Sequence, residues 1–206
     1  MAILTRTPPR SPREQRGCRR RDLRAVRRAV LIMTIGWIAG TSVSIAEEAL
    51  PSEYQVKAAF LINFPKYVDW PAEAFAKPNS PIVIAVLGET KVAEEIQKVI
   101  AGRTVNGREI LLKRLASGEQ PGICHILFIP AAEQRHSPDL LAKLKDSSVL
   151  TVGEDEPFAR NGGIITFVLR NGNVRLDIDL TAARKAGVTI SSRLLAVADV
   201  VKGKTN

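Results

Sequence analysis

Residues 162–201 decide the fold, and they read GGIITFVLRNGNVRLDIDLTAARKAGVTISSRLLAVADVV. Two apolar runs of this stretch meet at Asn171-Gly172. This dipeptide suits a two-residue type I′ turn, because both central residues of that turn take positive φ. The stretch therefore predicts a β-hairpin followed by two helices, the last of which reaches Val201.

The two arms of the predicted hairpin differ in polarity. Residues 164–169 are apolar except for Thr166, so both faces of this arm are expected to be buried. Residues 174–180 alternate between apolar and polar side chains, which is typical of a strand with one buried face. Arg175 and Asp177 belong to the polar face and are expected to meet water or a partner.

Two strand–helix–strand patterns precede the hairpin, at residues 82–115 and 123–152. The first strand of each pattern is apolar throughout, as in parallel sheets that are covered on both faces. Such units connect parallel strands by right-handed crossovers. We therefore expect an α/β fold: a mixed, mostly parallel sheet with two βαβ units, the C-terminal hairpin at one edge, and helices on both faces. The polar residues 153–163 predict a loop before the hairpin.

A further helix is predicted at residues 53–67. Ser52 and Gln55 form a capping-box pattern at its start, and Pro65 is expected to kink it. The segment is rich in aromatic residues, which are Tyr54, Phe60, Phe64, Tyr67 and Trp70. These rings are expected either to pack in the core or to form a surface that binds a partner.

The N-terminal residues have the three parts of a secretory signal. Residues 1–28 contain ten arginines and carry a net charge of +8 out of +9 for the whole chain. The apolar residues 29–39 follow, and they are too few for a permanent membrane span, which needs about 20 residues. Small residues at Ser44 and Ala46 predict cleavage after Ala46, which leaves residues 47–206 as one periplasmic α/β domain. The alternative is an uncleaved segment that anchors the chain in the inner membrane.

The mature chain offers little chemistry for catalysis. Its net charge near +1 gives no basic surplus that would indicate a nucleic-acid partner. Cys124 is its single thiol and lies in an apolar run, which favours a buried thiol that behaves as a small hydrophobic side chain. Cys124 and His125 point to opposite faces of a regular strand, so they do not form a catalytic dyad. His125 is instead expected to be a core or rim residue with a satisfied hydrogen bond.

A metal site is also not expected. Asp177 and Asp179 share one strand face, but two carboxylates give too few oxygen ligands for a hard cation. We therefore predict no catalytic residues, no cofactor and no metal, and we do not expect an enzyme.

Three motifs resemble a known family. Residues 53–64 (EYQVKAAFLINF) and 67–71 (YVDWP) resemble the opening of the YfiR-like periplasmic family. Residues 124–129 (CHILFI) are similar to its central strand, and residues 162–195 are similar to its ending. The resemblance covers nearly all of residues 52–201, with the motifs in the family's order.

The resemblance implies a periplasmic α/β protein, often dimeric, that restrains an inner-membrane diguanylate cyclase by contacting its periplasmic sensor part. Cyclic-di-GMP signalling and biofilm formation would follow from that contact. The family supplies no established catalytic residues. Of the disulfide cysteines in its better-known members, this chain matches only Cys124.

We therefore expect a periplasmic regulatory binding protein whose partner is a membrane sensor or diguanylate cyclase. The expected contact surface combines the aromatic helix with the open face of the hairpin, at Phe60, Phe64, Tyr67, Trp70, Arg175 and Asp177. The alternative is a periplasmic small-molecule binding protein that acts with a different membrane sensor, with a cleft near Gly88 and Pro130 beyond the carboxyl ends of the strands. A hydrolase that uses Cys124 is a third hypothesis.

Overall fold

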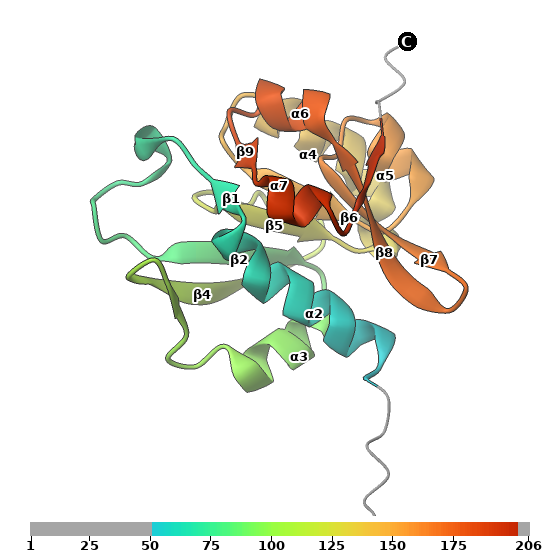
Figure 1. Ribbon diagram of the computed structural model, residues 1–206, viewed down its shortest axis with the longest axis horizontal. Helices are drawn as coiled ribbons and strands as arrows, with labels where there is room; N and C mark the ends of the chain where they lie inside the picture. Colours follow the sequence, from blue (N-terminus) through green and yellow to red (C-terminus); the bar gives the residue numbers. More distant parts are fainter. Residues whose placement is uncertain (1–50, 202–206) are drawn as a thin grey trace, which may run out of the picture. The chain divides into compact units, whose positions relative to one another are not determined.

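The computed structural model describes residues 51–201, and the predicted leader with its cleavage position after Ala46 lies outside them. An eight-stranded sheet organises the described residues (Figure 1). Its strands, from one edge to the other, are β10 (Asp199–Val201), β8 (Asn173–Asp179), β7 (Ile165–Arg170), β6 (Leu150–Gly153), β5 (Ile126–Ile129), β2 (Ile82–Leu87), β4 (Arg108–Leu115) and β3 (Thr104–Val105). Neighbouring strands are parallel except for the pairs β7–β8 and β3–β4. The predicted α/β class with a mostly parallel sheet is confirmed.

Both predicted βαβ units are present. The first runs from β2 through α3 (Lys91–Val99) to β4, and Thr90 caps the helix by accepting a hydrogen bond from the Ala93 N–H at 3.1 Å. The second runs from β5 through η3 (Ala131–His136) and α4 (Ser137–Leu144) to β6. In each unit the two strands are parallel members of one sheet, which brings their carboxyl ends to the same edge.

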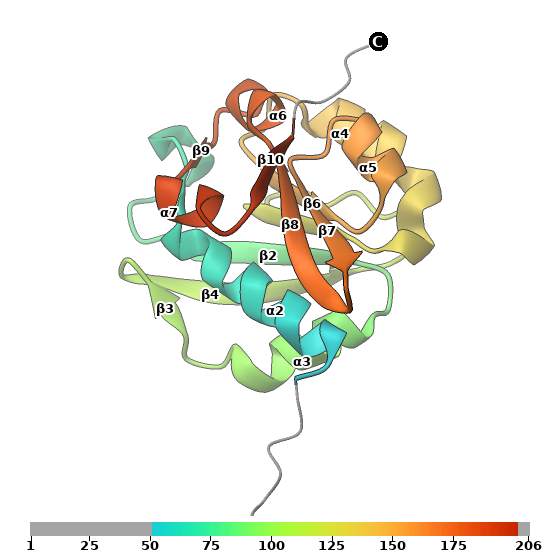
Figure 2. The ribbon, with the colours of Figure 1, turned by 45° about the vertical axis from the view of Figure 1, so that its right-hand side comes forward.

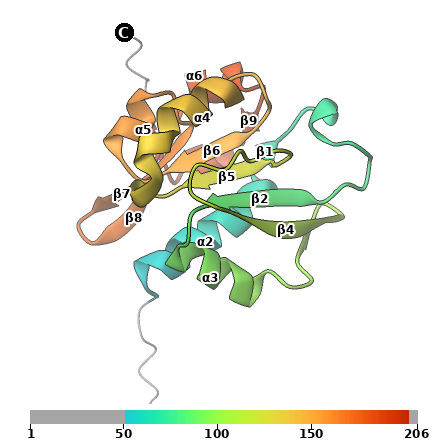
Figure 3. The ribbon, with the colours of Figure 1, turned by 180° about the vertical axis from the view of Figure 1, so that it is seen from behind.

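Helices cover both faces of the sheet, as predicted. The apolar sides of α2 (Glu53–Asn63) and α3 belong to one core, and those of α4 and α5 (Glu156–Arg160) belong to a second core on the opposite face (Figure 3). Helix α2 begins with the predicted capping box, in which the Ser52 hydroxyl accepts from the Gln55 N–H and the Gln55 amide oxygen accepts from the Ser52 N–H. Within residues 51–201 no helix combines the length and apolar character that a membrane span requires.

Helix α5 replaces the loop predicted at residues 153–163. Asp155 caps it by accepting from the Phe158 N–H at 2.9 Å, and this aspartate followed by Glu156-Pro157 is a typical helix start. The ring of Phe158 lies against Gly153 and Gly163, where a Cβ atom would fall within 2.3 Å and 2.0 Å of ring carbons. These two glycines therefore make room for a buried aromatic ring.

The hairpin turn is confirmed, with φ of 52° at Asn171 and 74° at Gly172. Only the first two residues of β7, Ile165 and Thr166, pair with β6, so the outer half of the hairpin protrudes beyond the sheet (Figures 1 and 3). Leu169 is consequently 57% exposed. The prediction that both faces of this arm are buried holds for its inner half and is wrong for its outer half.

The predicted last helix is wrong beyond its first turn. Helix α7 (Ser192–Leu195) is short, and β10 follows it, running parallel to β8 with Val200 beside Ile178 (Figure 2). The hairpin is therefore not the edge of the sheet. Two physical preferences favour this outcome: Val200 and Val201 are β-branched, and β8 would otherwise present unpaired backbone groups.

The first helix is shorter than predicted. Helix α2 ends at Asn63, and the turn η1 (Phe64–Lys66) follows, because the Pro65 nitrogen has no proton to continue the helical hydrogen bonds. The next strand, β1 (Val68–Asp69), pairs with β9 (Thr189–Ile190), which follows α6 (Leu180–Lys185). The start of the described chain is thereby joined to its end.

His125 fastens the segment that contains η2 (Ala72–Ala74) to the sheet. Its Nδ1 accepts from the Val83 N–H at 3.0 Å, and its Nε2 lies 3.2 Å from the Ala74 carbonyl oxygen, which assigns the ring proton to Nε2. Phe75 stacks on the imidazole with ring centres 4.5 Å apart. The predicted satisfied hydrogen bond is confirmed. Burial lowers the pKa of His125, and the nearby Arg108 adds to that effect, against the hydrogen bond to Ala74.

Four phenylalanines link α2 to the sheet. Phe60, Phe64 and Phe128 all surround Phe167 of β7, with ring centres between 6.0 Å and 6.3 Å from that of Phe167. Stacked and edge-to-face contacts of this kind add to the free energy gained from burial alone. Phe167 is therefore the central residue of this aromatic cluster.

Replacing Phe167→Ala is expected to lower the free energy of unfolding by about 3–5 kcal/mol, because the side chain is buried and leaves a cavity among three rings. Chemical denaturation of the purified protein measures the change. Leu169→Ala on the same strand is the matched control and should change stability by less than about 0.5 kcal/mol, since Leu169 is exposed. Similar losses in both variants would contradict the central role of Phe167.

Acid is expected to destabilise the fold through His125. The pKa of His125 is lower in the folded protein than its ordinary value of 6.5, so the unfolded chain binds more protons below pH 6.5. The free energy of unfolding should therefore be unaffected by His125 above this pH and fall as the pH drops below it. Urea denaturation at a series of pH values should show a shallower loss for His125→Asn than for the wild type. Equal pH dependence of wild type and His125→Asn would refute the assignment.

Candidate functional site

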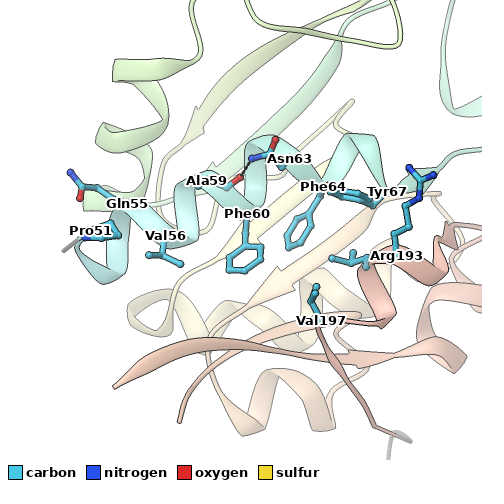
Figure 4. A pocket seen from close by; sticks show the side chains of 11 residues that line it. Pro51, Gln55, Val56, Ala59, Phe60, Asn63, Phe64, Tyr67, Arg193 and Val197 are labelled. Carbon is cyan, nitrogen blue, oxygen red and sulfur yellow. Dashed lines mark hydrogen bonds between the residues drawn. The ribbon is translucent and has the colours of Figure 1, made fainter. Parts of the chain in front are cut away.

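An apolar groove of about 640 Å³ lies between α2 and the segment that contains α7 (Figure 4). It is lined by Pro51, Gln55, Val56, Ala59, Phe60, Asn63, Phe64, Tyr67, Arg193, Leu194 and Val197. Its volume is within the usual range for small-molecule sites in proteins. Seven of the eleven lining residues, including Pro51, have hydrocarbon side chains. The groove is therefore a mainly apolar surface with few polar groups.

Helical spacing places the α2 wall of the groove. Ala58, Leu61 and Ile62 are buried against the sheet, which leaves Val56 and Phe60 on the neighbouring side of the helix. Residues three and four positions apart share a side of a helix, so this second stripe follows directly from the sequence. Figure 4 shows Val56, Phe60 and Phe64 pointing from the helix into the groove.

The opposite wall is placed by contacts between distant parts of the chain. The Ser191 N–H donates to the Tyr67 carbonyl oxygen at 2.8 Å, which continues the β1–β9 pairing and sets the start of α7 beside Tyr67. Ser191 then caps α7 through its hydroxyl, which accepts from the Arg193 N–H. Tyr67 and Arg193 thereby occupy the same end of the groove (Figure 4).

Exposed apolar side chains continue the surface beyond the groove. Val197 is 61% exposed and Val200 is 53% exposed. Val200 pairs in register with the buried Ile178, so it projects to the sheet face that α2 covers. Leu169 projects to the same face, two residues from Phe167. Together with the groove, these residues form what we call the α2-side surface.

The structure places three of the six predicted surface residues in the groove and three outside it. Phe60, Phe64 and Tyr67 line the groove, although Phe64 is almost fully buried. Trp70 lies away from it, half-buried, with its ring edge-on to His125 at 6.2 Å between centres. The predicted residues therefore do not form one continuous surface.

Arg175 and Asp177 lie on the opposite face of β8 from the buried Leu176. Asp177 accepts two hydrogen bonds from the Arg170 guanidinium, at 2.9 Å and 3.0 Å, and Arg170 also pairs with Asp199. This ion-pair network joins β7, β8 and β10. Both of its carboxylates thus share the single guanidinium of Arg170.

The second acidic residue of the hairpin has a structural role. The Asp179 carboxylate caps α6 by accepting from the N–H groups of Thr181 at 2.7 Å and Ala182 at 3.0 Å. Asp177 and Asp179 therefore have separate partners. Among residues 51–201, no group of three or more histidines, cysteines and acidic residues is placed to hold a metal ion.

Acidic side chains lie near Gly88 and Pro130, where the cleft was predicted. The Glu133 carboxylate lies so close to Gly88 that a Cβ atom there would be 2.7 Å from its Oε1. Glu154 accepts from the Ala131 N–H at 2.8 Å and from the Lys57 ammonium at 2.7 Å. The groove beside α2 is thus at a different place from the cleft that the strand order suggested.

Lys57 is a buried cation that was not predicted from the sequence. It pairs with Glu154 and with Glu53, one helical turn earlier. Burial by itself lowers the pKa of Lys57, but the hydrogen bonds to Glu154 and Glu53 outweigh it and hold the pKa above its ordinary value. The Glu-x-x-x-Lys spacing is the only sequence signal of this ion pair. Its role is to fix α2 against the carboxyl end of β6.

Cys124 is buried and does not contact a base. Burial raises the pKa of its thiol to about 11, although the nearby Lys113 acts in the opposite direction. The ring nitrogens of His125 are both engaged with backbone groups of other segments. The predicted buried thiol is confirmed, and the pair has no geometry for nucleophilic chemistry.

Comparisons with known proteins agree with this fold. Residues 54–199 match the profile of DUF4154, described as YfiR/HmsC-like. No curated protein matches the chain. A solved structure of a conserved domain protein from Vibrio cholerae O1 biovar eltor is similar in fold, with 12% sequence identity and a TM-score of 0.51.

That structural match covers 73% of this chain and 60% of the Vibrio chain, so this chain spans less than two thirds of that protein. The family match, in contrast, extends from the second residue of α2 to the first residue of β10. It confirms the resemblance that three sequence motifs indicated. This chain belongs to the YfiR/HmsC-like family.

Proposed function

We propose that this protein is an exported periplasmic regulator that restrains an inner-membrane diguanylate cyclase by binding its periplasmic sensor part. The family match over residues 54–199 is the observation that carries the proposal. The secretory pattern of residues 1–46 supports export. Lower cyclic-di-GMP and reduced biofilm formation would be the consequences.

The α2-side surface is the contact that we propose for this partner. Regulation by contact needs an apolar patch that a partner can cover, surrounded by polar residues. Phe60 and Tyr67 supply half-buried aromatic rings, while Val197 and Val200 supply exposed aliphatic side chains. Trp70, Arg175 and Asp177 lie outside this patch and would contribute only through a second contact.

We also propose that the protein acts without catalysis. The chemistry of its most reactive side chain supports this view, because a thiol with a pKa of about 11 is almost entirely protonated at neutral pH. Binding a partner does not require a nucleophile or a general base. The apolar lining of the groove therefore suits contact better than proton transfer.

The regulatory proposal predicts that deleting the gene raises cellular cyclic-di-GMP several-fold and that the wild-type gene restores the low level. Val197→Glu should fail to restore it, because a carboxylate is placed in the apolar contact. Leu111→Glu, which changes another exposed aliphatic residue on β4, should restore it fully. Thermal unfolding of both purified variants checks that they fold. Unchanged cyclic-di-GMP in the deletion strain, with no cyclase or sensor recovered on the protein from membranes, would refute the proposal.

The non-catalytic proposal predicts that Cys124→Ala keeps the full cyclic-di-GMP restraint. In the purified protein, iodoacetamide should alkylate Cys124 at least about 100-fold more slowly in buffer than in denaturant, because the pKa rises from 9.0 to about 11 on folding. Mass spectrometry follows the alkylation. Loss of restraint in Cys124→Ala, when the variant is folded, would favour the hydrolase hypothesis instead.

A further inference from the structure

The polar residues of the groove differ in whether their side chains are already engaged. Gln55 belongs to the capping box of α2. The Asn63 amide donates to the Ala59 carbonyl oxygen at 2.8 Å, and its oxygen accepts from the Lys66 ammonium at 2.7 Å. These groups therefore have little capacity left for a ligand.

Two hydrogen-bond donors remain at one end of the groove. Within residues 51–201, the Arg193 guanidinium and the Tyr67 hydroxyl make no hydrogen bond or ion pair with another residue. In Figure 4 the Arg193 side chain extends from α7 at the end of the groove that Tyr67 also lines. An apolar channel thus leads to a cationic end with free donors.

We propose that the groove binds an aliphatic carboxylate with a single chain, such as a free fatty acid. Its hydrocarbon chain would lie along α2 against Val56 and Phe60, with Val197 on the other side. Its carboxylate would accept a two-point hydrogen bond from Arg193 and a third hydrogen bond from the Tyr67 hydroxyl. Guanidinium and carboxylate groups match in shape and charge, and such charge-assisted pairs are stronger than neutral ones.

The chemistry of the groove favours this class over other small molecules. Burying a hydrocarbon chain gains roughly 0.8 kcal/mol per methylene group. A strongly polar ligand would instead lose hydrogen bonds to water without replacement along the apolar walls. Positive charge at one end selects an anionic head group over a neutral or cationic one. The inference concerns the purified protein alone and does not depend on the cyclase proposal.

Isothermal titration of the mature protein with dodecanoate below its critical micelle concentration, and with dodecanol below its solubility limit, tests the proposal. We expect saturable binding of dodecanoate at one site and binding of dodecanol that is at least about tenfold weaker, because the alcohol lacks the ion pair. Arg193→Gln should weaken dodecanoate at least about tenfold and leave dodecanol nearly unchanged. Arg184→Gln, which removes an exposed arginine from α6, is the matched control and should bind like wild type.

Ala59→Trp tests the location, because it fills the groove from an exposed position on α2 and should abolish binding of both ligands. Absence of saturable dodecanoate binding would overturn the proposal, as would equal binding of the alcohol or full binding by Ala59→Trp. If dodecanoate does not bind while Val197→Glu still loses the restraint of cyclic-di-GMP, the groove is a protein contact only. That result would reject the ligand and leave the proposed function standing.

Discussion

The packing of Phe60 and Phe64 on Phe167 is the contact on which the rest of the structure depends. It joins the first helix and the turn after it to a strand about 100 residues later in the chain. Once α2 lies on Phe167, its buried stripe is fixed and its second stripe must remain open to one side. The groove is therefore a consequence of how the core is closed.

Both ends of α2 are held by interactions with later parts of the chain. At its start, Lys57 pairs with Glu154 after β6, and breaking a buried ion pair by removing one partner is strongly destabilising. At its end, β1 pairs with β9 and Ser191 bonds to Tyr67. These contacts set the separation of α2 and α7. The walls of the groove are thus fixed by the same interactions that complete the sheet.

The sequence was sufficient wherever a local signal decides the structure. The βαβ unit at residues 82–115, the Asn171-Gly172 turn and the Ser52–Gln55 capping box were all predicted at their observed positions, because apolar runs, positive-φ dipeptides and capping residues act within a few residues. β10 was not predicted, since its residues form a strand only beside the free edge of β8. The same limit explains Ile123, which belongs to an apolar run and yet is 77% exposed just before β5 begins.

Only one wall of the groove could be predicted from the sequence, because the other wall is placed by contacts between distant parts of the chain. Phe60 and Tyr67 follow from helical spacing, whereas Arg193 and Val197 reach the groove only through a two-residue strand pair more than 100 residues along the chain. A ligand and a protein partner that both need the α2-side surface cannot occupy it together. A ligand that binds only the free protein stabilises that form by RT ln(1 + [L]/Kd), and it weakens partner binding by the same free energy. If both proposals hold, the concentration of an amphiphile in the periplasm sets how strongly the cyclase is restrained, with no conformational change required.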